Sequence, residues 1–139
     1  MAAIRKQVTR DVVSVGVSEP LRAAAQLMEE RRIGSVAVRD GARILGLVTE
    51  RDLMRTVCVL GVDPGRPVRE AMRASIPRVD ASSSESETAA LMRDHTTRHL
   101  LVEENGEVVG VISMRDIIQL MIDEKEHLID QLQTYIEGY

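Results

Sequence analysis

Aromatic side chains are nearly missing from this 139-residue chain, which has no Trp, no Phe and only two tyrosines, Tyr135 and Tyr139. Proteins that bind single-stranded nucleic acids usually stack the bases on aromatic rings, and here no ring occurs before residue 135. The net charge of −4 also disfavours a polyanionic partner. We therefore expect a core of aliphatic and Met side chains, and we do not expect a nucleic-acid partner.

Cysteine and long apolar segments are scarce as well. The single cysteine, Cys58, excludes an internal disulfide and a cysteine-based zinc site, and we interpret it as a small core residue. No apolar run approaches the roughly 18 residues that a membrane-spanning helix needs, and residues 1–10 lack the apolar centre of a signal peptide. These absences predict a soluble, cytoplasmic protein with no membrane partner.

Charges of opposite sign gather in the two halves of the chain. Residues 1–79 hold 14 basic and nine acidic side chains, whereas residues 80–139 hold four basic and 13 acidic ones. Such an asymmetry can mark a nucleic-acid surface. We favour the interpretation that the halves pair with each other or with a second copy of the chain.

What the chain does contain is an internal repeat with a period of 64 residues. Residues 15–54 align without a gap with residues 79–118, and nine of the 40 aligned positions are identical, against about three expected from average composition. The identical pairs are Val15/Val79, Ser18/Ser82, Ala25/Ala89, Leu27/Leu91, Met28/Met92, Val38/Val102, Gly46/Gly110, Arg51/Arg115 and Asp52/Asp116. Two copies indicate a tandem pair rather than a solenoid.

Each copy shows the same predicted order of elements, β-α-β-β-α, from its hydrophobic spacing and turn residues. The predicted elements of the first copy are a strand at 13–17, a helix capped by Ser18, strands at 35–39 and 43–48, and a helix from Thr49 toward Leu60. Those of the second copy are a strand at 76–79, a helix at 84–95, strands at 99–103 and 107–112, and a helix from Ser113.

The predicted fold class is mixed α/β (α+β), with two tandem repeats packed about a pseudo-twofold axis and an extended C-terminal helix. One unit of about 60 residues buries little core alone, so we expect the two to pack together and equivalent loops to face each other across a cleft. The predicted boundaries are 1–60 for the first repeat, 61–67 for a linker rich in Gly and Pro, 68–122 for the second repeat and 123–139 for a helical tail.

One motif recurs where the last strand of each copy meets the following helix. Its key residues are Gly46, Thr49, Arg51 and Asp52 in the first copy and Gly110, Ser113, Arg115 and Asp116 in the second. A helix N-terminus offers free N–H groups and a partial positive charge, which suit a phosphate. A hydroxyl can bind phosphate or sugar oxygens, a carboxylate can accept both ribose hydroxyls, and an arginine adds a phosphate-binding fork. The glycine permits close approach of another backbone or of a ligand.

A helix cap is the competing interpretation of this motif. The pairs Thr49/Asp52 and Ser113/Asp116 have the spacing of a capping box, in which hydroxyl and carboxylate satisfy N–H groups of the helix itself. A cap requires neither the glycine nor the arginine, so the occurrence of all four residues in phase favours a binding role. The hydroxyl can serve both purposes.

The chain resembles a tandem pair of CBS domains, also called a Bateman module, over residues 8–122. The resemblance rests on the doubled glycine–hydroxyl–aspartate motif and on the segments at 32–38 and 97–102. It implies a sensor of adenosine ligands, with AMP as the first candidate and ATP, ADP, NADH or S-adenosylmethionine as alternatives. It further implies that Asp52 and Asp116 hold the ribose and that Thr49 and Ser113 contact the ligand.

The resemblance also assigns roles outside the motif. Val13 and Ile76 fall where the first strand of the family lines the adenine. A basic pair that often reaches the phosphate is present only in the second copy, as Arg98 and His99, because the first copy has Gly34-Ser35 at the same place. The family often has Pro two residues after that pair, and this chain has Ala37 and Leu101 there. We therefore expect the two pockets to differ in charge and affinity.

Other candidate sites are weaker. The pair His95 and His99 has helical spacing for a metal, but Thr96-Thr97 interrupts the helix and no cysteine or acidic partner is in register, so we predict no metal site. No nucleophile–base arrangement or pair of catalytic carboxylates stands out. We accordingly predict no catalytic residues and no enzyme.

The C-terminal segment carries apolar residues at a spacing of seven. These are Met121, Leu128 and Tyr135, and Ile122, Ile129 and Ile136. Two heptads fit both an amphipathic helix on the chain's own surface and a dimer seam; the resemblance to CBS pairs favours a homodimer.

The resulting hypothesis is a regulatory adenine-nucleotide sensor that acts by ligand-dependent rearrangement of its repeats or of its dimer. The alternative is a dimerisation or interaction module that binds no ligand. The regulated protein is not indicated by the sequence.

Overall fold

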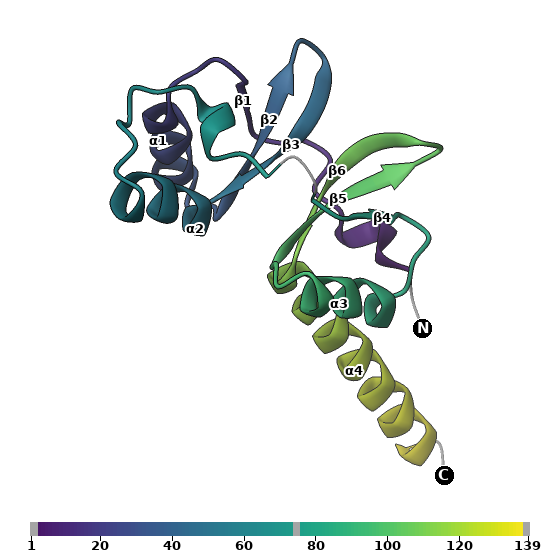
Figure 1. Ribbon diagram of the computed structural model, residues 1–139. Coiled ribbons are helices and arrows are strands. Elements are labelled where there is room, and N and C mark those ends of the chain that lie inside the picture. Colours follow the sequence, from purple (N-terminus) through teal and green to yellow (C-terminus); the bar gives the residue numbers. More distant parts are fainter. Residues whose placement is uncertain (1–2, 74–75, 138–139) are drawn as a thin grey trace. The chain divides into compact units, whose positions relative to one another are not determined.

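A computed structural model describes residues 3–73 and 76–137, which form two compact units. The first-repeat unit is Arg10–Pro77, and the second-repeat unit joins residues 3–9 to residues 78–137. Each unit contains one three-stranded sheet with helices packed against it (Figure 1). Tyr139, one of the two tyrosines, lies outside the described residues.

The order of elements within each unit is the predicted β-α-β-β-α. In the first-repeat unit the elements are β1 (Ser14–Gly16), α1 (Leu21–Arg31), β2 (Ser35–Asp40), β3 (Arg43–Thr49) and α2 (Glu50–Leu53), which continues as the π-helix η2 (Met54–Val59). In the second-repeat unit they are β4 (Arg78–Asp80), α3 (Glu85–Asp94), β5 (His99–Glu104), β6 (Glu107–Ser113) and α4 (Met114–Glu137). The α/β class, the tandem repeats and the extended final helix are thus confirmed, whereas the twofold relation stays a prediction.

The two sheets have the same topology for the same local reasons. In each sheet the first strand pairs in parallel with the second, and the second pairs in antiparallel fashion with the third. A parallel pair needs a crossover, which the intervening helix supplies, whereas the antiparallel pair needs only a tight turn. Asn105 and Gly106 form the second turn with positive φ angles of 55° and 80°, which these two residue types tolerate. Both sheets even share a register shift, at Val38/Arg39 and at Val102/Glu103.

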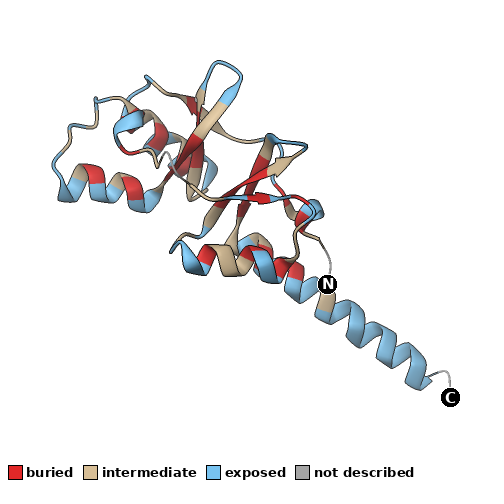
Figure 2. Cartoon of the chain, turned by 45° about the vertical axis from the view of Figure 1, so that its right-hand side comes forward, coloured by how far each residue is buried: buried red, intermediate tan, exposed pale blue. Residues whose placement is uncertain are grey.

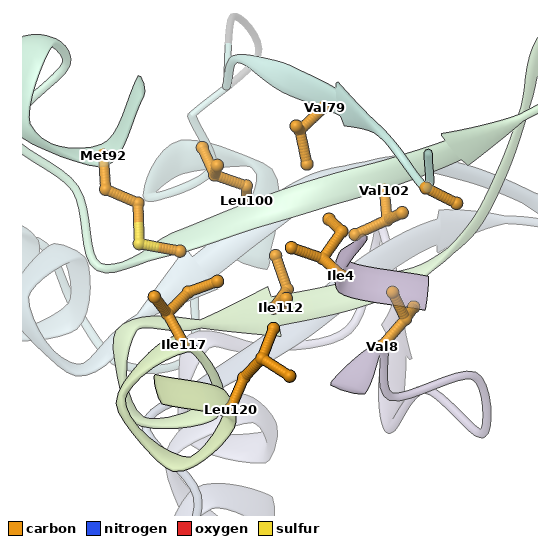
Figure 3. Close-up of a cluster of buried hydrophobic side chains, with 10 residues drawn as sticks. Ile4, Val8, Val79, Met92, Leu100, Val102, Ile112, Ile117 and Leu120 are labelled. Carbon is orange, nitrogen blue, oxygen red and sulfur yellow. The ribbon is translucent and has the colours of Figure 1, made fainter. Parts of the chain in front are cut away.

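Each unit buries an aliphatic core between one sheet face and its helices. The close-up in Figure 3 shows the second-repeat core, where strand, helix and N-terminal side chains meet. That core contains Ile4, Val8, Val79, Ala81, Met92, Leu100, Val102, Ile112, Ile117 and Leu120. The first-repeat core contains Val15, Leu21, Ala24, Met28, Val36, Val38, Val48, Val68 and Ala71. No aromatic ring takes part in either cluster, as the composition predicts.

The segments that precede the two repeats, residues 3–9 and 67–73, are here called the leader segments. Each packs on the repeat that it does not precede: Ile4 is fully buried in the second-repeat core, and Val68 is fully buried in the first-repeat core. Short backbone bridges fix them, since Thr9 pairs with Val111 and Arg73 pairs with Leu47. The boundaries at 1–60 and 68–122 describe the duplicated sequence, whereas residues 3–9 pack in the second-repeat unit and residues 67–73 in the first-repeat unit.

Two local predictions were wrong. Pro20, not Ser18, precedes α1 as its N-cap, and no side chain caps that helix. Cys58 is exposed instead of buried in the core. It lies in η2, two residues beyond the buried Thr56, and because two residues make about half a helical turn, the Cys58 side chain faces the opposite way.

Candidate functional site

The first motif places a hydroxyl and a carboxylate in reciprocal contact at the start of α2. Asp52 Oδ2 accepts hydrogen bonds from the backbone N of Thr49 at 2.9 Å and from Thr49 Oγ1 at 3.0 Å. The backbone N of Asp52 donates in return to Thr49 Oγ1 at 3.2 Å. This is a complete capping box, and it orders the turn between β3 and α2.

The second motif repeats this geometry at the start of α4. Asp116 Oδ2 accepts from the backbone N of Ser113 at 2.8 Å and from Ser113 Oγ at 2.9 Å, and the backbone N of Asp116 donates to Ser113 Oγ at 3.2 Å. The capping interpretation therefore applies to both copies. Each box uses only the Oδ2 atom of its aspartate, so the chemistry of the site depends on what faces Oδ1.

The two Oδ1 atoms have different surroundings. Asp52 Oδ1 accepts a hydrogen bond from Arg73 Nε at 2.8 Å and lies 3.6 Å from Arg55 Nη2, and the Asp52 side chain is fully buried. Asp116 is only half-buried, and the structure shows no ion pair between it and an arginine of the described residues. The hydroxyl–carboxylate geometry is thus repeated, while the charge around the carboxylate is not.

Arg73 is a residue of the candidate site that was not predicted from the sequence. It lies in the leader segment, 21 residues beyond Asp52, so neither helical nor strand spacing connects the two. The repeat could have drawn attention to Arg73, because the 64-residue shift that aligns the two motifs also aligns Arg73 with the uncharged Thr9. Both residues form the backbone bridge to the third strand of a sheet.

The motif glycines make room for that bridge. A Cβ atom built on Gly46 would lie 2.7 Å from the carbonyl oxygen of Arg73, and one on Gly110 would collide with the carbonyl oxygen of Thr9. A motif glycine permits the close approach of either a backbone or a ligand, and in the structure a backbone occupies the space. Gly46 and Gly110 are both buried.

The basic pair of the second copy lies directly beside its motif. His99 pairs with Ser113 across β5 and β6, and the backbone N of Met114 donates to the carbonyl of Arg98 at 2.8 Å. The first copy has the same backbone arrangement, with Ser35 paired to Thr49 and Gly34 accepting from the N of Glu50 at 3.1 Å. The backbone therefore places Arg98 and His99 beside Ser113 and the start of α4, and the equivalent positions of the first copy are Gly34 and Ser35.

The remaining predicted site residues are placed as follows. Val13 is half-buried at the edge of the first-repeat core, and its carbonyl accepts from Ala37 N at 2.9 Å. Ile76 is half-buried and belongs to the first-repeat unit, whereas Asp116 belongs to the second-repeat unit. The remaining two, Arg51 and Arg115, are exposed in the first turns of α2 and α4.

His95 and His99, which were considered as a possible metal-binding pair, lie in different parts of the fold. His95 is exposed and its Nδ1 lies 3.0 Å from the carbonyl oxygen of Leu91 in its own helix, whereas His99 begins β5. Within residues 3–73 and 76–137, three or more His, Cys, Asp or Glu side chains nowhere gather as metal ligands would. In the same part of the chain, every helix is too short or too polar to cross a membrane.

Several curated proteins are similar to this chain over most of their length. Hypoxic response protein 1 of Mycobacterium tuberculosis is 34% identical over 133 residues, which cover 94% of this chain and 91% of that protein. The CBS domain-containing protein YhcV of Bacillus subtilis is 25% identical over 117 residues, covering 84% of each chain.

Solved structures agree with the fold. A putative signal-transduction protein with CBS domains from Burkholderia ambifaria is 35% identical and superposes with a TM-score of 0.80, covering 86% of this chain and 91% of its own. Hypoxic Response Protein I, solved with two coordinated zinc ions, is 34% identical with a TM-score of 0.72, covering 86% of this chain and 98% of its own.

The family assignment follows from both repeats together. The CBS domain model matches residues 4–58 and 68–123, which span most of the chain and coincide with the two copies of the repeat. CBS pairs are typically regulatory rather than catalytic modules, and they generally bind adenosine ligands. With two matched domains, a doubled motif and the fold of CBS-pair structures, this chain belongs to the CBS-domain family.

Proposed function

We propose that this chain is a regulatory module that binds an adenine nucleotide, with AMP as the first candidate. The observation that carries the proposal is the grouping of Ser113, Asp116, Arg98 and His99 at the junction of β5, β6 and α4. A carboxylate can accept the two ribose hydroxyls there, and a basic pair next to a helix N-terminus suits the phosphate. Ligand binding would then shift the population of conformations or of dimers that a regulated protein recognises.

Calorimetry with AMP, ADP, ATP, NADH and S-adenosylmethionine tests this proposal. We expect AMP to bind the wild-type chain and to bind Arg98→Ala about tenfold more weakly, because a charge-assisted contact to phosphate is lost. Arg93→Ala is the matched control, since Arg93 is an exposed arginine of α3 that pairs with Asp94. Absence of heat with all five ligands would overturn the adenine-nucleotide proposal.

A second candidate function, self-association, is favoured by the exposed face of α4. This helix is 24 residues long, and beyond Leu120 it is exposed over nearly all of its described length (Figure 2). Its exposed large apolar side chains are Ile118, Met121, Ile122, Leu128, Ile129, Leu132, Tyr135 and Ile136, with exposed fractions of 37–69%. A standard stable interface buries roughly 800 Å² per partner, and eight exposed large apolar side chains on one helix offer apolar surface for such a contact.

Light scattering after size-exclusion chromatography tests whether this face joins two chains. We expect the wild-type chain to be a dimer, and Ile129→Asp with Leu132→Asp to be a monomer that keeps its circular dichroism spectrum. Glu126→Gln on the same helix is the control. A monomeric wild type at high micromolar concentration would contradict the dimer, and AMP binding by the monomeric variant would separate sensing from association.

A further inference from the structure

We propose that Arg73, by pairing with Asp52, prevents the carboxylate of the first repeat from binding a ribose. Each chain would then bind one adenine nucleotide, at the second repeat. The inference rests on the proposed adenine-nucleotide function and names the repeat that performs it. Its basis is the ion pair between Arg73 Nε and Asp52 Oδ1, at 2.8 Å, for which the second repeat has no counterpart among the described residues.

The ion pair uses the atom that a ligand would need. The capping box already engages Asp52 Oδ2 through two donors of Thr49, and Arg73 with Arg55 engages Oδ1. The Asp52 side chain has no exposed surface, so a ribose can reach it only after Arg73 leaves. Removing one partner from a buried ion pair leaves an unpaired buried charge, which is costly.

The backbone holds Arg73 where its side chain reaches Asp52. The N of Arg73 donates to the carbonyl of Leu47 at 3.3 Å, and its own carbonyl lies over Gly46, where any larger residue would collide. In each repeat the leader segment thus lies at close range over the motif glycine of the third strand. These backbone contacts therefore fix the position of Arg73 beside Asp52.

The second repeat has the same backbone geometry with a different side chain. Thr9 exchanges hydrogen bonds with Val111 at 2.9 and 3.0 Å, and its carbonyl lies over Gly110. Threonine is short and uncharged, so it supplies no ion pair to Asp116. The carboxylate of Asp116 is half-buried and remains available to an incoming hydroxyl group.

The charges beside each motif also favour binding of the nucleotide phosphate at the second repeat. Where the second copy has Arg98, His99 and Met114, the first copy has Gly34, Ser35 and Glu50 in the same backbone positions. A phosphate would therefore meet two basic side chains in the second repeat and a carboxylate in the first. Carboxylate and phosphate repel each other, whereas the basic pair attracts phosphate.

Equilibrium dialysis and calorimetry with AMP test the proposal through stoichiometry. We expect one AMP per wild-type chain, about tenfold weaker binding by Asp116→Asn, and less than about a twofold change in Asp52→Asn. Arg73→Thr copies the residue of the other leader segment and frees Asp52. It should retain the first AMP with unchanged affinity and admit a second, weaker one, whereas the control Arg69→Thr, an exposed arginine of the same segment, should not.

The outcomes separate this inference from the proposed function. Two equivalent AMP molecules per wild-type chain, equal losses in the two aspartate variants, or a stoichiometry of one in Arg73→Thr would overturn the inference alone. Weaker binding by Arg73→Thr would overturn it too, by making Arg73 a phosphate ligand. A wild type that binds no adenine nucleotide would overturn both. The ion pair itself is tested without ligand, since Asp52→Asn should lower the thermal unfolding midpoint more than Asp116→Asn does.

Discussion

At the scale of single residues, identical motif positions have acquired different physical roles. Asp52 and Asp116 close the same capping box, but only Asp52 is fully buried and paired with arginines. A cap contributes about 1 kcal/mol, whereas breaking a buried ion pair costs several times as much. Asp52 is therefore foremost a stability residue, and Asp116 can be altered at smaller cost to the fold.

The two aspartates should differ in urea unfolding. We expect Asp52→Ala to lose about 2–4 kcal/mol of unfolding free energy, because the cap is lost and Arg73 is left without its partner. Asp116→Ala should lose about 1 kcal/mol, the value of the cap alone. Equal losses in the two variants would contradict the different roles.

Glu85 is a buried carboxyl group at the start of α3 and predicts a pH dependence. It is 7% exposed, and within the described residues its Oε2 has no hydrogen-bond partner. Burial raises the pKa of Glu85, and its hydrogen bond to Glu124 and repulsion by that carboxylate raise the pKa further. Lys125 is the basic residue of the groove that Glu85 and Glu124 line together with apolar side chains of α4.

The direction of this pH dependence follows from whether the folded or the unfolded protein binds the Glu85 proton more tightly. The folded pKa lies above the ordinary value of 4.5, so the folded state is favoured at low pH and loses stability as pH rises above 4.5. We expect Glu85→Gln to melt higher than wild type above pH 6 and at the same temperature near pH 4. The exposed Glu87→Gln, on the same helix, should show no such crossover in thermal melts at a series of pH values.

At the scale of elements, the arrangement within each repeat could be predicted because it is set by local periodicity. Alternating valines, the Asn105-Gly106 turn and the hydroxyl before each motif helix are signals a few residues long, and the structure confirms the elements they predict. The contacts that could not be predicted are long-range. No local pattern says which repeat a leader segment packs against, and no spacing connects Arg73 to Asp52. Cys58 was misplaced because its apolar neighbours do not show which face of the helix is buried, and Val59, beside it, is exposed as well.

The contact between a leader segment and its motif glycine can be tested in both repeats. Gly46→Ala and Gly110→Ala should each cost about 1–3 kcal/mol of unfolding free energy, because a Cβ has no space against the carbonyl of Arg73 or Thr9. Gly16→Ala in β1 is the control, since its Cβ would meet only ordinary contacts at 3.5 Å or more. Denaturant unfolding of the three variants measures the difference, and a loss at Gly16 as large as at Gly46 would argue against steric exclusion.

At the scale of the whole molecule, the sensing and the self-association that we propose involve different parts of the chain. The motifs lie at the starts of α2 and α4, while the exposed apolar face continues to the last described turns of α4. The near absence of aromatic residues makes these parts spectroscopically separable, because Tyr135 lies in the distal part of α4 and is 64% exposed.

Tyrosine fluorescence should therefore report on association alone. In a Tyr139→Phe variant, acrylamide quenching of Tyr135 should fall as protein concentration rises through the dimerisation range, because the ring becomes shielded by the second chain. At a protein concentration above that range, where association is complete, saturating AMP should leave the quenching constant unchanged. A concentration-independent constant would place Tyr135 outside any interface between chains.

Each leader segment packs on the repeat that it does not precede. The ends of the duplicated sequence segments therefore differ from the ends of the two folded units. A fragment that starts at residue 1 and stops before Val68 lacks the side chain that fills the first core, and it carries Ile4, which belongs to the other core. The fragment Arg10–Pro77, by contrast, includes every residue of the first core. We therefore expect dissection of this protein to keep each core complete when it is cut at the ends of the leader segments, and to divide the cores when it is cut at the ends of the repeats.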